Sequence, residues 1–456
     1  MYENRSAAYY QLILKVIECP NGKESQLLNA HSELLDPGLL SMIIVVAKNF
    51  DESGNQDTVN FLNDLALQFG EFLGSEQQET AIREETADIF FEWGIEQYYI
   101  SQSPIAFQCW QQCLIIYQAM HDRQGEAASV GNLGTAYYSL GELEKAIYFH
   151  EQSLAINQEI QDHQGEANSL INLGNIYLDM GQFERAIDAH EKSLAICQKI
   201  KDFKGRASSL IGLGNACNCL GQFENAINFY KHSLDISREI KYFQGEASAL
   251  ANLGVAYHFL GEYEQAITFQ EKSLAIKLEI KNRRAEANSL TNLGIAYNSL
   301  GQLEQAIAFH KKSLTISHKI KYRQGEAKSL GGLGNAYYSL GEHKRAIACH
   351  KKSLVINREI KNRSGEAACL GNLSNVYQSL GEYEQAIAFH EQDLAICQEI
   401  KDRFGEATCF GNLGIAYKSL GEYERAIRCQ EQSLAISREI KHRQGEANSL
   451  GNLGTA

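Results

Sequence analysis

Histidine recurs at one position of a forty-residue period in this 456-residue sequence, and imidazole is both a common metal ligand and a common general base. The histidines at that position are His150, His190, His310, His350 and His390. A metal site needs three or four ligands that converge on one ion at about 2 Å. The period supplies one imidazole per repeat and no converging set. The sequence therefore predicts half-buried packing residues, with no metal and no cofactor.

The eleven cysteines also follow the period. Cys109, Cys349 and Cys429 replace residues of the Phe149 type, whereas Cys369 and Cys409 replace small residues of the Ser129 type. An odd number of cysteines without a C-x-x-C pair indicates neither a disulfide framework nor a zinc ribbon. The pattern favours packing roles for the thiols.

A glutamate column begins the first helix of nearly every repeat. Its members are Glu126, Glu166, Glu246, Glu286, Glu326, Glu366, Glu406 and Glu446, with Arg206 as the exception. A negative charge in the first turn interacts favourably with the helix dipole, so a structural role suffices. No Ser-His-Asp arrangement, phosphate-binding glycine loop or paired catalytic carboxylates stands outside the period. We therefore expect no enzymatic activity.

Asparagine is the polar residue whose placement points to binding. One column lies opposite the expected core face of the first helices and a second lies one turn further on. The columns are Asn132, Asn172, Asn252, Asn292, Asn372 and Asn412, followed by Asn175, Asn215, Asn335 and Asn375. An amide both donates and accepts, so such columns can pair with the main chain of an extended peptide. The alternative is that they bond neighbouring loops or helices.

The middle of the second asparagine column is apolar. Val255 and Ile295 replace asparagine there, and Phe259 stands where other repeats have serine. Apolar residues flanked by amides suit a peptide that anchors one or two large side chains at the centre.

The unit that positions these residues is GEAASVGNLGTAYYSLGELEKAIYFHEQSLAINQEIQDHQ, from Gly125 to Gln164, which returns every forty residues. Apolar steps of three and four predict a first helix to about residue 140, a glycine turn, and a second helix over about 142–160. Short acceptors precede the first helices and are expected to cap them. These are Asp122, Asp162, Asp202, Asn282, Asn362 and Asp402; Tyr242 and Tyr322 do not suit that role.

Within the unit, Leu133, Gly134, Tyr137, Ala146 and Leu154 follow the tetratricopeptide pattern L-G-x2-Y…A. The run GNLGTAYYSLGELEKAI resembles the repeats of the LGN/Pins family and, more distantly, kinesin light chains, over roughly residues 85–456. The resemblance implies an all-α, right-handed superhelical solenoid of antiparallel helix pairs whose first helices line a concave peptide-binding groove. The histidine column and the missing terminal proline depart from the family pattern.

The period divides the chain. Residues 1–84 lie outside it and are expected to form a helical cap, with helices near 10–17, 27–35, 39–50 and 59–72. Residues 85–124 form a degenerate repeat, residues 125–444 eight repeats, and residues 445–456 a short ninth copy. Because that copy lacks a second helix, we expect its apolar residues to promote end-to-end association.

The formal charge of −14 argues against nucleic acid as a partner, because such binding depends on clustered Lys and Arg. The longest apolar run, Leu39–Ala47, is too short to cross a bilayer. These features predict a cytoplasmic scaffold that binds extended protein segments. Two alternatives stay open: the sensory arm of a larger protein, such as a CHAT-type peptidase with an effector after Ala456, and a helical phosphatase-type regulator whose active residues lie in the cap.

Overall fold

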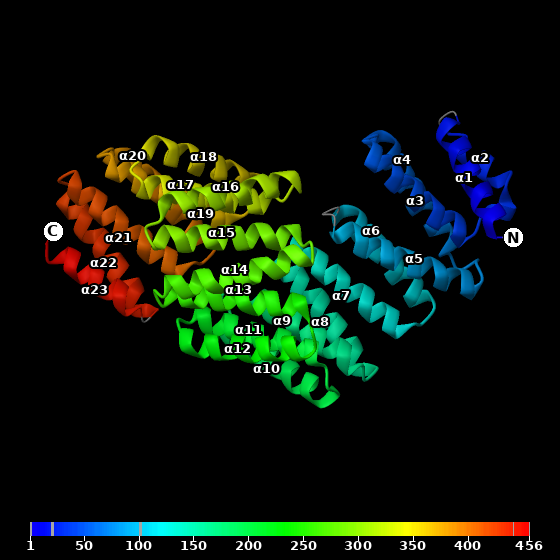
Figure 1. The fold of residues 1–456 in the computed structure, drawn as a ribbon, viewed down its shortest axis with the longest axis horizontal. Coiled ribbons are helices and arrows are strands. Elements are labelled where there is room, and N and C mark those ends of the chain that lie inside the picture. Colours follow the sequence, from blue (N-terminus) through cyan, green and yellow to red (C-terminus); the bar gives the residue numbers. More distant parts are fainter. Residues whose placement is uncertain (1, 20–21, 100–102, 441, 456) are drawn as a thin grey trace. The chain divides into compact units, whose positions relative to one another are not determined.

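A computed structural model describes residues 2–19, 22–99, 103–440 and 442–455. Over these residues the chain forms 23 α-helices and one 3-10 helix, with no strand (Figure 1). The chain divides into two compact units, Met1–Ala216 and Cys217–Ala456, and helix α11 crosses the boundary. Consecutive helices pack as antiparallel pairs within each unit, so the expected all-α fold of stacked helix pairs is confirmed.

The helices of the first unit are α1 (Tyr2–Glu18), α2 (Glu24–Asn29), η1 (Ser32–Leu34), α3 (Pro37–Ser53), α4 (Gln56–Leu73), α5 (Thr80–Tyr99), α6 (Ser103–Ala119), α7 (Arg123–Ser139), α8 (Leu143–Glu159), α9 (His163–Asp179), α10 (Phe183–Ile200) and most of α11 (Phe203–Cys219). The helices of the second unit are α12 (Phe223–Glu239), α13 (Phe243–Phe259), α14 (Tyr263–Glu279), α15 (Arg283–Ser299), α16 (Leu303–Lys319), α17 (Arg323–Ser339), α18 (His343–Glu359), α19 (Arg363–Ser379), α20 (Tyr383–Glu399), α21 (Arg403–Ser419), α22 (Tyr423–Glu439) and α23 (Arg443–Leu453). Ala456, the end of the expected short copy, lies outside the described residues.

Local signals explain where the repeat helices begin and end. The Asp122 carboxylate accepts hydrogen bonds from the backbone N–H groups of Gln124 and Gly125, which caps α7 as predicted. Tyr242 and Tyr322 make no such bond. Gly141 closes the turn after α7 at φ 77°, a conformation that glycine adopts without strain. The second helix of a repeat ends in a left-handed residue that is not glycine, Lys in six repeats.

The expected second cap helix, over 27–35, is wrong in its extent. The segment forms the short helix α2 and the separate 3-10 turn η1 instead. Neither piece contains a fully buried residue, and the segment's leucines, Leu27, Leu28, Leu34 and Leu35, pack only partly buried against the core, so two short pieces satisfy the packing without a continuous helix. The core of this region lies instead among α1, α3, α4 and α5, where Leu12, Leu39 and Leu62 are buried.

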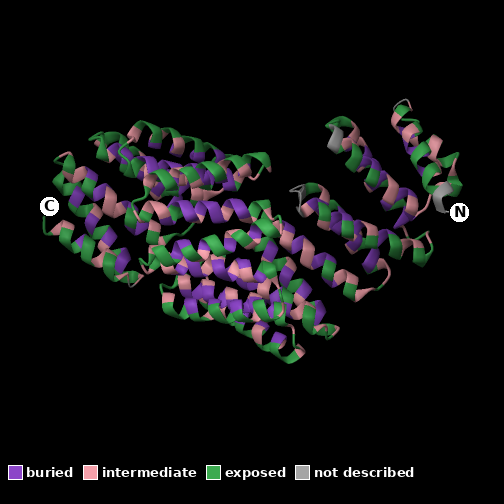
Figure 2. Cartoon of the chain, in the orientation of Figure 1, coloured by how far each residue is buried: buried purple, intermediate pink, exposed green. Residues whose placement is uncertain are grey.

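Burial alternates along the repeat helices, with buried faces turned toward neighbouring helices (Figure 2). Small residues permit the closest contacts: Ala146 and its equivalents Ala186, Ala226, Ala266, Ala306, Ala346, Ala386 and Ala426 are 0–1% exposed. The buried faces also hold a set of polar side chains that recurs at each repeat boundary.

Candidate functional site

The histidine column is buried more completely than the sequence indicated. All five rings are 0–1% exposed. The rings of His150, His190, His310 and His350 each lie against a glycine of a first helix. The ring of His190 lies between Gly174 and Gly212, where added Cβ atoms would meet it at 2.5 and 2.2 Å. Burial lowers the pKa of each imidazole to about 4. The column is therefore neutral at physiological pH.

A second buried polar feature lies where each second helix meets the first helix of the next repeat. We call it the interface triad, the set equivalent to Ser153, Asn157 and Ser169. Ser153 Oγ donates to the carbonyl oxygen of Ala127 at 2.9 Å and lies 3.2 Å from Ser169 Oγ. The same serine-to-carbonyl bond recurs from Ser193, Ser273, Ser313, Ser353 and Ser433, at 2.7–3.1 Å. That bond joins the two helices of one repeat, whereas the serine–serine contact, which recurs at Ser193–Ser209, Ser313–Ser329 and Ser433–Ser449, joins one repeat to the next.

The composition of the triad varies from one repeat boundary to the next. The nine sets are Cys113/Tyr117/Ser129, Ser153/Asn157/Ser169, Ser193/Cys197/Ser209, Ser233/Ser237/Ala249, Ser273/Lys277/Ser289, Ser313/Ser317/Ser329, Ser353/Asn357/Cys369, Asp393/Cys397/Cys409 and Ser433/Ser437/Ser449. All the sets occupy equivalent backbone positions. A difference in behaviour between two sets can therefore be attributed to their side chains.

Lys277 places an amino group inside one triad. Its side chain is 7% exposed, and Nζ donates to Ser289 Oγ at 2.7 Å. Burial lowers the pKa of this ammonium group to about 8. Keeping the Lys277 ammonium charged at neutral pH therefore lowers the stability of the folded chain.

We expect Lys277→Met to stabilise the second unit by about 2 kcal/mol at pH 7, since burying the ammonium costs about 3 kcal/mol and its hydrogen bond returns part of that. The folded pKa lies below the ordinary 10.5, so the unfolded chain binds more protons between pH 8 and 10.5. The native chain should gain stability across that window and the variant should not. Urea unfolding of both at pH 7 and 10 checks this; an equal difference at both pH values would contradict it.

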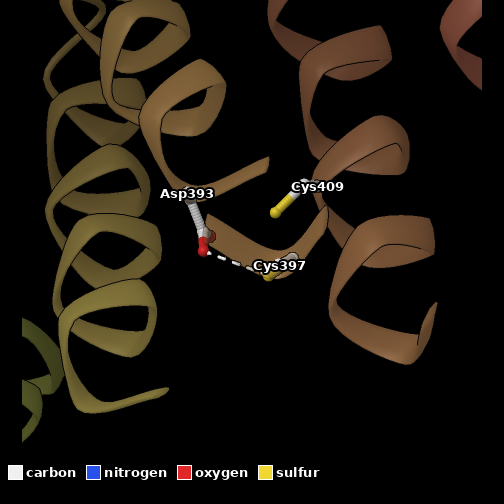
Figure 3. Close-up of side chains that lie close together, drawn as sticks. All are labelled: Asp393, Cys397 and Cys409. Carbon is white, nitrogen blue, oxygen red and sulfur yellow. Dashed lines mark hydrogen bonds between the residues drawn. The ribbon is translucent and has the colours of Figure 1, made fainter. Parts of the chain in front are cut away.

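Asp393, Cys397 and Cys409 form the triad with the most unusual chemistry (Figure 3). Asp393 and Cys397 lie one turn apart on α20, and Cys409 faces them from α21. Their ligand atoms all lie within 4.8 Å of one another, and all three residues are buried. The sequence pattern predicted a packing role for Cys409 and no role for Asp393. The sequence does mark Asp393 as unusual, because seven other copies carry serine at its position.

The glutamate column is tied into ion pairs that extend beyond the helix dipole. Glu326, 4% exposed, pairs with Arg323 of its own helix and accepts from His318 of α16 at 3.2 Å. Arg323 also reaches Glu359 at the end of α18. The arrangement repeats around Arg363 and Arg403. These contacts link three successive helices, which supports a structural role.

The first asparagine column lies on half-buried faces of the first helices, while Asn335 and Asn375 of the second column are exposed. Within the described part of the chain, five side-chain amides of the first column make no hydrogen bond to another protein group. They are those of Asn132, Asn172, Asn292, Asn372 and Asn412. By contrast Asn452, at the equivalent position of α23, donates to Gln430 Oε1 at 3.4 Å.

Two hollows contain members of this column. In the first unit, Asn132 and Asn172 line a hollow of about 500 Å³ among α7, α8 and α9. In the second unit, Asn412 and Ile415 line one of about 580 Å³ among α21, α22 and α23. Asn175 also lies on α9, and the other asparagines of the two columns are distributed along the remaining first helices. Of the expected groove residues, Asn132 and Asn172 thus share one hollow.

The apolar centre of the expected groove lies on α13 and α15. Val255 is half-buried, Ile295 is 41% exposed and Phe259 is 57% exposed. Phe259 stands in the last turn of α13, and its ring stacks on Phe223 of α12 with centroids 5.5 Å apart. This places Phe259 near the helix turns, one helical turn from Val255.

Among the described residues, none of the helices combines the length and apolar character needed to cross a bilayer.

Comparison with solved structures supports the fold. A Rap protein complexed with Competence and Sporulation Factor matches 80% of this chain and 99% of its own at 14% identity, with a TM-score of 0.57. The sensor-bearing signal transduction ATPase PH0952 of Pyrococcus horikoshii matches 82% of this chain and 55% of its own at 17% identity, TM-score 0.55. Aspartyl phosphate phosphatase F of Bacillus subtilis matches 77% and 93% at 16% identity, TM-score 0.50. Such identities show a shared fold alone.

No curated protein matches the chain. The tetratricopeptide repeat model, however, matches residues 101–159, 165–239, 245–319, 325–399 and 366–439, which is most of the sequence. The matched segments are the helix pairs described above, with their glycine turns and small contact residues. The chain therefore belongs to the tetratricopeptide repeat family.

Proposed function

We propose that this protein is a scaffold without enzymatic activity that binds extended segments of partner proteins along the asparagine-bearing faces of its first helices. The observation that carries the proposal is the first asparagine column. Its half-buried side chains include five amides that make no bond to another described protein group. An amide in that setting has both a donor and an acceptor to offer a peptide main chain.

The hollow in the first unit supports the same interpretation. A volume of about 500 Å³ beside Asn132 and Asn172 provides space for a bound side chain next to amides that would hold the main chain. In the second unit, Val255, Phe259 and Ile295 supply apolar surface for a large side chain of the ligand.

We expect Asn172→Ala, Asn335→Ala and Asn375→Ala each to weaken binding by about 0.5 to 1.5 kcal/mol for any ligand sequence, as for one exchanged hydrogen bond. Phe259→Ser should cost about 2 kcal/mol or more, but only with ligands that carry a large apolar anchor. Affinity capture from a lysate of the source organism followed by mass spectrometry supplies the partner, and titration calorimetry on a peptide from it measures both effects.

Glu264→Lys on the exposed surface of α14 is the matched control, since it changes a second helix away from the asparagine faces. Circular dichroism must show that every variant stays folded. Loss of binding with Glu264→Lys, together with unchanged binding by the asparagine variants, would rule out the proposed surface.

A second candidate function is the sensory arm of a larger protein. It is favoured by the likeness to PH0952, a multidomain signal transduction ATPase with a tetratricopeptide repeat sensor, of which the matched region covers 55%. A CHAT-type peptidase is another effector of this kind. Sequencing the gene beyond the codon for Ala456 distinguishes an arm from an independent scaffold.

Partner class, redox state and self-association are proposed from charge, thiols and exposed apolar surface. A nucleic-acid partner is disfavoured by the charge of −14. Free thiols at all eleven cysteines suit the reducing cytoplasm. Leu450 on α23 is 47% exposed and is the apolar group through which self-association would occur.

A further inference from the structure

One interface triad differs from the other eight in carrying an acidic residue at its first position and cysteine at both of the others. Each of the other triads contains at most one residue of a type that binds soft divalent metals, namely Cys113, Cys197 or Cys369. The triad between α20 and α21 consists of Asp393, Cys397 and Cys409 and therefore contains three. Two thiols and a carboxyl group are a donor set suited to zinc.

The carboxyl group is difficult to explain by packing. Serine at this position donates its hydroxyl proton to a main-chain carbonyl in six copies. An ionised carboxylate has no proton to donate, and Asp393 is 8% exposed. Burying a carboxyl group costs more free energy than burying a serine hydroxyl, and the serine copies avoid that cost.

The atoms are already close to the required spacing. Around a tetrahedral zinc ion, with Zn–S about 2.3 Å and Zn–O about 2.0 Å, sulfur and oxygen ligands lie about 3.5 Å apart and two sulfurs about 3.8 Å apart. Cys397 Sγ lies 3.5 Å from Asp393 Oδ1. All the ligand atoms lie within 4.8 Å of one another. Side-chain rotations that move these atoms by about 1 Å would therefore bring them to the spacing of zinc ligands.

Two glycines, Gly371 and Gly405, leave room around the proposed ligands. A Cβ on Gly371 would lie 2.8 Å from Asp393 Oδ2, so glycine makes room for the longer acidic side chain, and Gly371 itself is half-buried. At Gly405 a Cβ would lie 2.5 Å from Asp402 Oδ2 and 2.7 Å from Cys397 Sγ. Asp402 therefore places a further carboxylate oxygen beside the thiol.

We propose that Asp393, Cys397 and Cys409 bind one zinc ion that clamps α20 to α21, with the fourth position taken by water or by Asp402. Binding displaces the two thiol protons, and the proton of Asp393 where that group is protonated. The ion then bears two thiolates and a carboxylate. This inference contradicts the expectation from the sequence that no metal is bound, and it does not depend on the proposed peptide-binding function.

The test uses the full chain, reduced and stripped of metal with a chelator. Zinc is titrated against a chromophoric competitor, and cobalt serves as a spectroscopic substitute. We expect one zinc per chain and a thiolate-to-cobalt charge-transfer band. The triple variant Asp393→Ser, Cys397→Ser, Cys409→Ser restores the all-serine triad found at Ser313 and Ser433. It should fold and bind zinc at least about 100-fold more weakly, since even outer-shell changes cost 10–100-fold.

A double variant, Cys197→Ser with Cys369→Ser, removes thiols from two other triads and should leave affinity and stoichiometry unchanged. Asp393→Ser alone retains both thiols, and should weaken zinc binding at least tenfold and change the cobalt spectrum. Equal zinc binding by the native chain and the triple variant would overturn the site. So would the absence of binding to the reduced chain, including the case in which Cys397 and Cys409 only form a disulfide, which non-reducing peptide mass spectrometry detects.

Discussion

Acidification from pH 8 to pH 5 is expected to remove about 10 kcal/mol of stability from this protein through the histidine column alone. Burial lowers the pKa of His150, His190, His310, His350 and His390 to about 4 in the folded chain. The ordinary value in the unfolded chain is about 6.5. Unfolding therefore takes up protons below pH 6.5, and native stability falls as the pH drops from 6.5 toward 4.

The magnitude follows from linkage. At pH 5 each unfolded histidine is almost fully charged while each folded one is almost fully neutral, which costs about 2 kcal/mol per residue. Five residues give about 10 kcal/mol, comparable to the whole stability of an ordinary domain. Two of the histidines lie in the first unit and three in the second, so at pH 5 the first unit should lose about 4 kcal/mol and the second about 6 kcal/mol.

Two repeats of the chain carry glutamine at the histidine position and suggest a control variant. Gln270 and Gln430 occupy the same repeat position and donate to the carbonyl oxygens of Ala251 and Gly411 at 2.8 and 2.7 Å. A variant with all five histidines changed to glutamine should fold and keep its stability between pH 7 and 5. Urea unfolding followed by circular dichroism at pH 8, 6 and 5 compares the two proteins. If both lose the same stability over this range, the column does not cause acid unfolding.

Replacing Gly254 by leucine should destabilise the array by about 3 kcal/mol or more and divide unfolding into two stages. A Cβ at Gly254 would lie 2.7 Å from Gln270 Nε2 and 3.0 Å from the carbonyl oxygen of Ala266. The amide can move aside, but the backbone of α14 cannot, so the longer side chain forces α13 and α14 apart. Each repeat contacts mainly its neighbours, so a broken contact uncouples the flanking repeats.

Gly254→Ser tests whether size is the cause. Ser374 occupies the equivalent position on α19, and its hydroxyl donates to the carbonyl oxygen of Ala386, the equivalent of Ala266. The serine variant should therefore unfold in one transition close to that of the native chain. Denaturant unfolding monitored by fluorescence and circular dichroism distinguishes the two outcomes. An unchanged single transition for the leucine variant would show that the helices separate at little cost.

Local features of the fold were predictable because their causes lie within a few residues. The expected first helix and glycine turn correspond to α7 and Gly141, and Asp122 caps α7 as expected. Cap acceptors, turn glycines and apolar steps act over one or two helical turns, and eight copies of the period repeat the same signal. The segment over 27–35 lacks this repetition, and the single helix predicted there is two shorter pieces in the structure.

The helix face on which each asparagine lies could be predicted from the sequence, but whether its side chain is available to a ligand could not. Helical spacing alone places Asn132 and Asn172 on equivalent faces. Whether their amides bond neighbouring groups or stay available depends on side chains from other helices, as Asn452 and Gln430 illustrate. The same limit applies to Phe259, whose stacking on Phe223 joins two repeats.

The sequence by itself determined the helix-pair repeat, its helix caps and the columns of equivalent residues. Each of these depends on residues close together in the chain or on the forty-residue period. The tertiary structure decided which of these residues are buried and which meet. Asp393, Cys397 and Cys409 come together only because α20 packs on α21, which places the last residue opposite the first two. The acid sensitivity of the histidines has the same origin, since burial between helices, and not sequence position, removes water from the imidazole and disfavours its charge.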